Sequence, residues 1–402
     1  MKHPLCALAL LSLLAACAPL PTQPDDAATT ASATPPTPHL RVLGSVGLDY
    51  ATPFGDTLVG GLSGIDYDPA TQRYLLISDD RATHDPVRAY TAKLRYSSSG
   101  LQPPEFTAVT FLLHPGQQRF TPTHRPQAGV EVPDPEAARW LPGTEAFLWT
   151  SEGDFARGFG PQLRTHHWGD GAQLRHYQLP DAFTPRPVEG MGPRANGTLE
   201  GLALSPDGRT AWLAMELPWW QDGPLATHER PGGPVRITAI DVESGQALRQ
   251  IAYQPDALPH APRLPLVAPV LGVSEILADG EHHLLVLERA YSLGHGFHVR
   301  LYRIDTRQGS DTLGLAALQP GNHRVPPKTL VADFAQLALP SVDNIEGMTW
   351  GPELPELPGG GCVLVFVSDN NFNPAQRTQF IAAHYQGMGD GEGHCSAPRS
   401  QP

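Results

Sequence analysis

One hairpin-like segment recurs five times along the chain, and this repetition constrains the fold more than any other feature of the sequence. In its clearest copy, from Glu200 to Glu216, two apolar runs flank the turn 205–208, and an acidic residue stands at each end. The other copies run from Ser63 to Asp79, from Glu136 to Glu152, from Glu275 to Glu288 and from Glu346 to Asp369. Such repetition is typical of folds in which one supersecondary unit is used several times.

Each hairpin is followed by segments that predict two further strands. In the third copy these are residues 235–240 and 247–251. The four-stranded units begin near residues 63, 136, 200, 275 and 346, a period of roughly seventy that fits one propeller blade. We therefore predict an all-β protein, a β-propeller of four-stranded blades. Five blades are expected, six stay open if a long interval hides an irregular one, and a β-sandwich pair is the more distant alternative.

The fifth unit is one strand short, because after residues 380–385 the chain continues into glycine and polar residues. Residues 40–46 can supply the missing outer strand, which would close the ring and remove an exposed sheet edge. The predicted propeller domain spans residues 39–386, and residues 387–402 are predicted to form a flexible tail.

The N-terminus predicts export. The apolar run Leu5–Ala16 is too short to span a bilayer and is typical of a secretory signal peptide, here residues 1–16. The run ends in Leu14-Ala15-Ala16-Cys17, which resembles a bacterial lipobox and implies cleavage before Cys17 and lipidation of that cysteine. Ordinary secretory cleavage near Ala16 is the alternative. Residues 17–38, rich in Pro, Thr and Ala, are expected to form a tether.

The expected location is the bacterial cell envelope, with a lipid anchor as the only contact with a membrane. Ala18 rather than Asp after the lipidated cysteine favours the outer membrane, with the protein facing the periplasm. With 41 acidic against 28 basic residues, nucleic acid is not expected as a partner. We expect a monomer. An oxidising compartment permits a disulfide between Cys362 and Cys395, although both thiols can also be free.

Acidic residues are expected to gather at one mouth of the propeller channel. The inner strand of a blade begins at the face where the next strand ends, so the two ends of each repeat lie close together. The residues brought to this mouth would be Ser63, Asp79, Asp80, Glu136, Glu152, Asp154, Glu200, Glu216, Glu275, Glu288, Glu346, Asp369, Asn370 and Asn371. Clustered carboxylates raise one another's pKa and need cations, and their hard oxygen ligands favour Ca²⁺. Alternatively, some of these acids only cap strand ends or pair with arginines.

Basic residues accompany the acids along the sequence. Arg81, Arg157, Arg289 and Arg377 lie close to acidic repeat ends, where they could hold a phosphate together with calcium or form ion pairs between blades. His84 is a candidate acid or base at the same rim. Ser63 is a weak candidate nucleophile, because Ile65 breaks the Gly-x-Ser-x-Gly pattern.

Several of these segments resemble one protein family. They are residues 62–69 with 78–81, residues 150–153, residues 200–203, and residues 345–347 with 368–371. They resemble the phytase-like family, whose members are labelled as having esterase-like activity of phytase. The resemblance covers roughly residues 40–386. It implies a phosphoric-ester hydrolase in which bound calcium polarises a phosphate and activates water.

The resemblance implies Asp79, Asp80, Glu200, Glu216, Glu346 and Asp369 as calcium ligands and Arg81 as a phosphate clamp. Together with the channel-mouth argument, we predict Asp79, Asp80, Arg81 and Glu200 as catalytic residues. The predicted metal ligands are Glu136, Glu152, Glu216, Glu275, Glu288, Glu346, Asp369 and Asn370. Two departures stand out. Ala137 and Ile276 occupy positions where the family has glycine, and only Lys93 and Lys328 follow the signal peptide, few for a highly phosphorylated substrate.

Two hypotheses for function follow. The first is a calcium-dependent hydrolase of small phosphoric esters at the acidic channel mouth. The second is a non-catalytic envelope propeller that is stabilised by calcium and binds a ligand or a partner protein. A carboxyl esterase using Ser63 ranks third. The fold alone does not decide between them.

Overall fold

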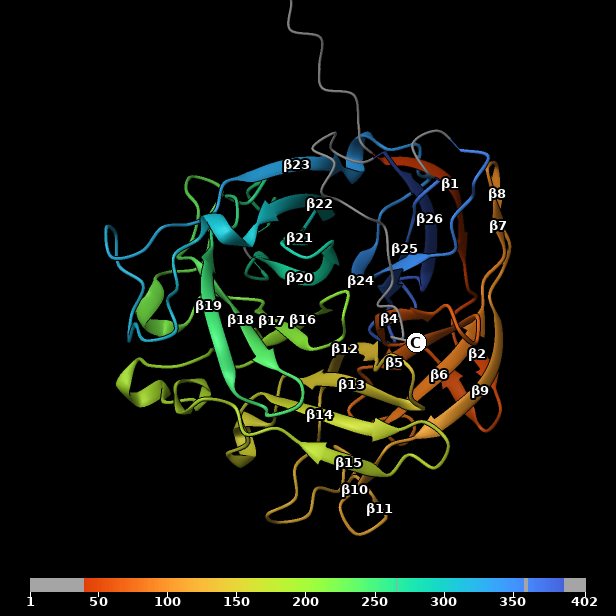
Figure 1. Ribbon diagram of the computed structural model, residues 1–402, viewed down its shortest axis with the longest axis horizontal. Coiled ribbons are helices and arrows are strands. Elements are labelled where there is room, and N and C mark those ends of the chain that lie inside the picture. Colours follow the sequence, from red (N-terminus) through yellow and green to blue (C-terminus); the bar gives the residue numbers. More distant parts are fainter. Residues whose placement is uncertain (1–39, 265, 358–360, 387–402) are drawn as a thin grey trace, which may run out of the picture. The chain divides into compact units, whose positions relative to one another are not determined.

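The computed structural model describes residues 40–264, 266–357 and 361–386. These residues form five four-stranded antiparallel sheets around a common axis (Figure 1), which confirms the five-bladed β-propeller. The predicted signal peptide, the tether with Cys17, the tail 387–402 and Cys395 lie outside the described residues. Cys362 is disulfide-bonded. Within the described ranges no helix is both long and apolar enough to cross a membrane.

The blades follow one another along the chain. Blade 1 contains β4 (Leu62–Asp68), β5 (Arg73–Ser78), β6 (Arg88–Lys93) and β9 (Glu105–Phe111), and blade 2 contains β12 (Pro135–Trp140), β13 (Ala146–Ser151), β14 (Gln162–His167) and β15 (Gln173–His176). Blade 3 contains β16 (Leu199–Leu204), β17 (Thr210–Met215), β18 (Val235–Asp241) and β19 (Ala247–Tyr253). Blade 4 contains β20 (Val270–Asp279), β21 (His283–Ser292), β22 (Gly296–Asp305) and β23 (Lys328–Asp333).

Blade 5 contains β24 (Asn344–Gly351), β25 (Val363–Asp369), β26 (Gln379–Tyr385) and the N-terminal strand β1 (Leu40–Gly47). Strand β1 pairs antiparallel with β26, so that Leu40 lies opposite Tyr385 and Gly47 opposite Gln379. This pairing fulfils the expectation that an N-terminal strand completes the last blade. It also covers what would otherwise be an open sheet edge.

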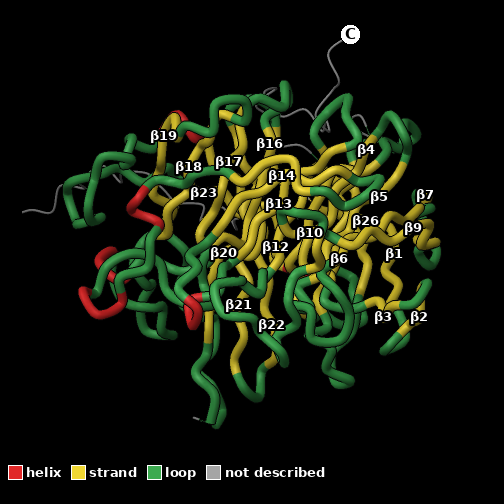
Figure 2. Tube along the Cα trace, turned by 90° about the horizontal axis from the view of Figure 1, so that it is seen from below, coloured by secondary structure: helices red, strands yellow, loops and turns green. Residues whose placement is uncertain are grey.

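The remaining elements are short and belong to the connections between the blade strands. These connections lie at both ends of the strands (Figure 2). The extra strands are β2 (Thr52–Phe54), β3 (Thr57–Val59), β7 (Tyr96–Ser97), β8 (Gly100–Leu101), β10 (Leu113–His114) and β11 (Gln118–Arg119). The 3₁₀ helices are η1 (Phe155–Arg157), η2 (Asp181–Phe183), η3 (Pro187–Glu189), η4 (Trp220–Asp222), η5 (Thr306–Gln308) and η6 (Phe334–Gln336).

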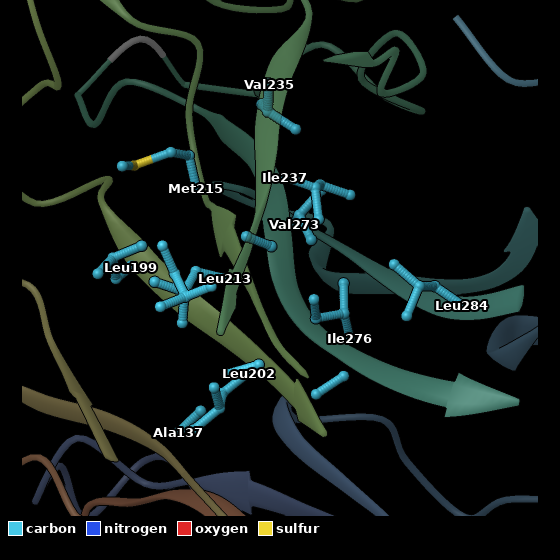
Figure 3. Close-up of a cluster of buried hydrophobic side chains, with 14 of the residues drawn as sticks. Ala137, Leu199, Leu202, Leu213, Met215, Val235, Ile237, Val273, Ile276 and Leu284 are labelled. Carbon is cyan, nitrogen blue, oxygen red and sulfur yellow. The ribbon is translucent and has the colours of Figure 1, made fainter. Parts of the chain in front are cut away.

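The core lies between neighbouring blades. Strands covered on both faces are nearly continuously apolar, as in β16 and β17. Leu202 and Leu213 of blade 3 belong to one buried cluster with Val273 and Ile276 of blade 4 (Figure 3). Burial of the apolar side chains of this cluster removes their surface from water. This stabilises the contact between neighbouring blades.

Each innermost strand carries a β-bulge near its beginning. The register with the second strand shifts between Leu62 and Gly64, and equivalent shifts occur in β12, β16, β20 and β24. The residue after the bulge lies close to the next blade. A Cβ atom on Gly64 would come within 2.6 Å of the carbonyl oxygen of Glu136, so only glycine fits there. Bulges re-aim side chains, and here they determine which residues face the channel.

A buried ion pair ties the five inner strands together. The guanidinium of Arg139 in blade 2 donates to Glu275 Oε2 at 2.7 Å and to the carbonyl oxygens of Ile65, Ile276 and Met348 in blades 1, 4 and 5. The other oxygen of Glu275 accepts from the backbone N–H of Leu202 in blade 3 at 2.9 Å. Glu275 therefore joins blades across the axis.

Candidate functional site

Two residues per blade define the functional end of the channel. One is the extra residue that the β-bulge adds to the innermost strand. The other belongs to the second segment of the hairpin: it comes one residue after the partner of the residue that precedes the bulge. In blade order the bulged positions are Ser63, Glu136, Glu200, Ser274 and Glu346. The following positions are Asp79, Glu152, Glu216, Arg289 and Asp369. The repeated hairpin thus delivers ten equivalent positions, and seven of them are acidic.

A pocket of about 1050 Å³ opens over these positions. We call its acidic part the acidic mouth, formed by Asp79, Asp134, Glu136, Glu152, Glu200, Glu216 and Glu346. Ligand atoms of Asp134, Glu136 and Glu152 lie within 4.8 Å of one another, and so do those of Glu152, Glu200 and Glu216. Glu152 belongs to both groups, so the two carboxylate triads share one side chain.

The acidic mouth is strongly coupled electrostatically. Burial, followed by the charge of Glu200, raises the pKa of Glu136 well above its usual range. Burial and Glu216 do the same to the pKa of Glu200. Burial and neighbouring acids raise the pKa values of Glu152 and Glu216 to about 7. In the absence of a cation, these groups therefore hold protons at pH values where exposed carboxyls are ionised.

Asp79 and Asp369 extend this cluster on the blade 1 and blade 5 side. Burial raises the pKa of both carboxyls well above the usual range, and Asp369 and Glu346 add to the effect on Asp79. Asn344 donates through Nδ2 to Glu346 Oε1 at 2.9 Å and to Asp369 Oδ2 at 3.3 Å. This amide bridges two acids that would otherwise only repel each other.

Arg289 and Arg81 bring positive charge to the pocket in different ways. Arg289 lies 2.9 Å from Glu346 and 3.3 Å from Glu216 through Nη2, and its side chain is buried. Burial alone would lower its pKa, but the surrounding carboxylates raise it. Arg81 is 38% exposed in its side chain and lies 3.3 Å from Asp134. Arg81 is therefore the cation that an incoming anion can reach.

Asp80 is bound within its own blade. Its carboxylate accepts from Arg88 Nη1 at 2.5 Å, from the backbone N–H groups of His84 and Asp85, and contacts the ring Nδ1 of His84 at 2.9 Å. Burial would raise its pKa, but Arg88 and these hydrogen bonds lower it overall. Asp80 thus stays ionised and fixes the loop that carries Arg81 and His84.

A sequence profile described as phytase-like, esterase-like activity of phytase, matches residues 57–372. The chain belongs to this family. The match spans all five repeats from Ser63 to Asp369, so the resemblance noted from the sequence is confirmed. Family membership fits a hydrolase-like propeller. A search of curated proteins finds no match to the sequence.

Solved structures of similar fold come from several kinds of protein. An α-L-arabinofuranosidase from Podospora anserina is 11% identical with a TM-score of 0.43, and the match covers 86% of this chain and 98% of that one. Regucalcin from Agrobacterium tumefaciens, described as a calcium-binding protein, is 12% identical with a TM-score of 0.37, over 90% and 99% of the two chains. Such distant similarity does not bear on function.

Two predicted metal ligands of this phytase-like protein lie away from the acidic mouth. Glu275 is paired with Arg139 on the axis. Glu288 accepts from Tyr253 Oη at 2.6 Å and from Lys328 Nζ at 2.5 Å, the latter on the outer strand β23. The fourth repeat uses Ser274 and Arg289 at the positions assigned to these acids. Side chains alternate between the two faces of a strand. Glu275 and Glu288 each lie one residue from the channel-facing position, so their side chains point to the opposite face.

Three further expected residues have local roles. Asn370 Oδ1 accepts from the backbone N–H groups of Gly61 and Phe372, so this amide holds the turn after β25. Asp154 pairs with Arg157 at 2.7 Å. The hydroxyl of Ser63 donates to the carbonyl oxygen of Pro135 at 3.2 Å, as that of Ser274 does to Ile345. The two bulge serines therefore join neighbouring blades in the same way.

Asp134 and Asn344 were not anticipated. Both stand two residues before a bulged acid, Glu136 or Glu346, and both line the large pocket. Burial raises the pKa of Asp134 to about 7, although Arg81 opposes the rise. A search for polar residues at this offset from each repeat start would have found them.

The walls of the pocket are partly aromatic. Strands β21 and β22 are ten residues long and carry Tyr291 and Phe297 to the pocket edge, with ring centroids 5.0 Å apart. Phe372, another pocket residue, is stacked on His84 at 4.3 Å. The site therefore combines an acidic floor with apolar surfaces that suit the organic part of a ligand.

Proposed function

We propose that this protein is a calcium-dependent hydrolase of phosphoric esters that acts in the acidic mouth. One observation carries the proposal: two buried carboxylate triads share Glu152 in a pocket that also presents the accessible guanidinium of Arg81. Metal-binding carboxylates beside an arginine are the combination that phosphoryl transfer requires.

The donor set fits calcium. Calcium takes six to eight oxygen ligands in flexible geometry, and the triads offer carboxylate oxygens only. Burial and repulsion between neighbouring carboxylates raise the pKa values of these acids, and a divalent cation would favour their ionised form. Asp134, Glu136, Glu152, Glu200 and Glu216 would hold it, with Glu346 at the edge. When bound, calcium would polarise a phosphate oxygen and increase the acidity of a water molecule.

The protein's own side chains would divide the remaining work. Arg81 would bind the phosphate oxygens, because it is charged and partly accessible. Arg289 would keep Glu216 and Glu346 ionised through its contacts of 3.3 and 2.9 Å. Asp79 is the carboxyl proposed for proton transfer, since burial raises its pKa well above the usual range and lets it hold a proton, whereas Glu200 would act as a calcium ligand. Asp80 would act only by positioning the Arg81 loop.

The lining of the pocket favours an ester with a single phosphate and an organic group of moderate size. Apart from His84, the cationic side chains among its described lining residues are Arg81 and Arg289, and Arg289 is committed to two carboxylates. Lys328 is bound to Glu288 and Asp256 instead. Tyr291, Phe297 and Phe372 can contact the organic group. If Cys17 carries the proposed lipid anchor, this reaction takes place at the cell envelope.

The test is phosphate release from phenyl phosphate and from phytate, with calcium and after chelation. We expect calcium-dependent release that is faster for phenyl phosphate, and no recovery with Mg²⁺ in place of Ca²⁺. Absence of release from either ester, together with a calcium-dependent rise in melting temperature, would contradict the enzyme proposal. It would favour the alternative, a calcium-stabilised propeller that binds a ligand or partner. Asp80 is compatible with that alternative, because this predicted catalytic group is paired with Arg88 within its own blade.

A further inference from the structure

A smaller cavity of about 210 Å³ lies beside the hairpin formed by β21 and β22. Three histidines line it: His260 from the segment between β19 and β20, His295 from the turn of the hairpin, and His298 from the start of β22. Gly296 and Phe297 belong to the lining of this cavity and also to that of the large pocket. The two sites therefore share one wall, but the histidine cavity contains none of the acids of the acidic mouth.

The three imidazole rings contact one another. The rings of His260 and His295 are stacked with centroids 4.6 Å apart and an angle of 17° between their planes. His298 meets His260 edge-on at 6.0 Å and 89°. Two hydrogen bonds keep the segments together, because Ser292 Oγ donates to the His260 carbonyl and the His295 N–H donates to the Ser292 carbonyl, both at 2.9 Å.

A carboxylate backs one of the rings. Nε2 of His298 lies 3.3 Å from Oδ2 of Asp333, an ion-pair distance, although the two atoms are not in hydrogen-bond geometry. Asp333 is itself held by Arg300 Nε at 3.0 Å and by the backbone N–H of Ala335 at 3.0 Å. If Asp333 accepts the Nε2 proton, the lone pair of His298 is on Nδ1. Histidines that bind metals are commonly oriented by a carboxylate in this way.

Two of the three rings are accessible to a ligand, because His260 and His295 are exposed. No hydrogen bond to a ring nitrogen of His260 or His295 is found within the described part of the chain. Their lone pairs are therefore not committed to protein donors there.

We propose that His260, His295 and His298 bind one transition-metal ion, such as Zn²⁺, Co²⁺ or Cu²⁺, with Asp333 orienting His298. Imidazole nitrogen suits these borderline ions, whereas Ca²⁺ prefers carboxylate and carbonyl oxygen. The site is thus chemically distinct from the acidic mouth, and it does not depend on the proposed hydrolase activity.

Metal binding would change the hairpin. Stacked rings cannot direct their nitrogens to one point, so the His295 ring has to leave the stack. His295 lies between Gly294 and Gly296, with φ angles of +90° and +79°, a turn that glycine can readily adjust. Because Phe297 is next in sequence and lines the large pocket, a bound ion would also fix one aromatic wall of that pocket.

The test is titration of the purified protein with Co²⁺ in excess Ca²⁺, which would saturate the calcium site proposed for the acidic mouth. Binding is followed by the visible absorption of bound Co²⁺ and by calorimetry with Zn²⁺. We expect one ion per chain and an absorption spectrum of nitrogen coordination. His295→Ala, which changes an exposed turn, should lower the affinity at least tenfold, and Asp333→Asn roughly 10-fold to 100-fold. His323→Ala, at a half-buried histidine outside this cavity, is the matched control and should bind like the wild type.

Two results would overturn the proposal. One is no uptake of Co²⁺ or Zn²⁺ in the presence of calcium. The other is uptake that His295→Ala and His298→Ala leave unchanged while both variants keep the wild-type melting temperature. Since phosphate release plays no part in these measurements, failure here and failure of the hydrolase proposal are distinguishable.

Discussion

Arg289 of blade 4 donates through Nη2 to Oε1 of Glu346 in blade 5 at 2.9 Å, from the position that an acidic residue occupies in every other blade. The propeller repeat thus replaces one acid of its ring by a base. This replacement places a permanent cation among carboxylates that would otherwise only repel one another. The acids of the two carboxylate triads all come from blades 2 and 3, whereas Arg289 comes from blade 4.

Arg289→Met should strongly destabilise the protein when calcium is removed. The substitution keeps much of the side-chain volume but leaves Glu216 and Glu346 buried without their cation. Removing one partner of a buried ion pair costs roughly 3–5 kcal/mol. Urea unfolding in chelator at pH 7 would measure the loss. Arg95→Met, which breaks the exposed pair with Glu105, is the control and should cost about 1 kcal/mol or less. Equal effects of the two substitutions would contradict this role for Arg289.

The sequence predicted the hairpin repeat, the five blades and the closing strand, since these depend on apolar periodicity and spacing. It also predicted that Glu136, Glu152, Glu200 and Glu216 lie at the channel mouth, where the structure has them, because the sixteen-residue interval between repeat ends is regular in these blades. The assignment of the repeat ends was wrong in blade 4. There the interval from Ser274 to Arg289 is one residue shorter, so the nearby acids Glu275 and Glu288 were mistaken for the repeat ends.

The failure has a physical cause. A β-bulge adds one residue to the inner strand, and its position decides which side chain faces the channel. That position depends on packing against the neighbouring blade, here on Arg139 reaching Glu275 across the axis. Such a contact between residues 136 positions apart leaves no local signal in the sequence. Asp134 was missed for a simpler reason, because it precedes its strand and belongs to no repeat end.

Glu200→Gln should separate metal binding from folding. Burial and Glu216 raise the pKa of Glu200 well above its usual range, so an uncharged amide replaces a largely uncharged carboxyl in the metal-free protein. We expect a metal-free stability within about 1 kcal/mol of the wild type at pH 7. The calcium affinity should fall at least tenfold, about 1.4 kcal/mol, because an anionic ligand is lost. Melting curves with chelator and with calcium would measure both effects.

The matched control for that substitution is Glu275→Gln. It removes a charge from the ion pair with Arg139, 2.7 Å away, outside the acidic mouth. It should therefore lower the stability by about 3 kcal/mol with or without calcium, and leave the calcium-induced shift in melting temperature unchanged. A reduced calcium shift in Glu275→Gln would argue that calcium binds elsewhere.

Without calcium, stability should decrease as the pH rises. The pKa values of Asp134, Glu152 and Glu216 are raised to about 7, so between about pH 4.5 and 7 the folded state holds protons that the unfolded chain has released. The contribution of these protonated acids to the free energy of unfolding is complete below the pKa of the unfolded chain. It is lost as the pH rises through 7, by roughly 3 kcal/mol for one independently titrating group. Calcium requires the ionised acids, so its stabilising effect should grow over the same range. Urea midpoints at several pH values would test this, and a metal-free stability that increases from pH 5 to 7 would contradict it.

Arg81→Gly should lower the phosphoesterase activity while sparing the fold. Arg81 has a φ angle of +54°, in the left-handed region where glycine is favoured, so the substitution relieves backbone strain. It also removes the accessible guanidinium found among the described lining residues of the pocket. Such a loss typically costs about 10²-fold to 10³-fold in kcat for a charge-stabilising donor. We expect kcat/KM for phenyl phosphate to fall at least 100-fold, with an unchanged or slightly higher melting temperature in calcium. Arg157→Ala should leave kcat/KM unchanged, since Arg157 lies outside the lining of the pocket. If both substitutions lower kcat/KM equally, the arginines act through the general field of the protein, and Arg81 does not clamp the phosphate.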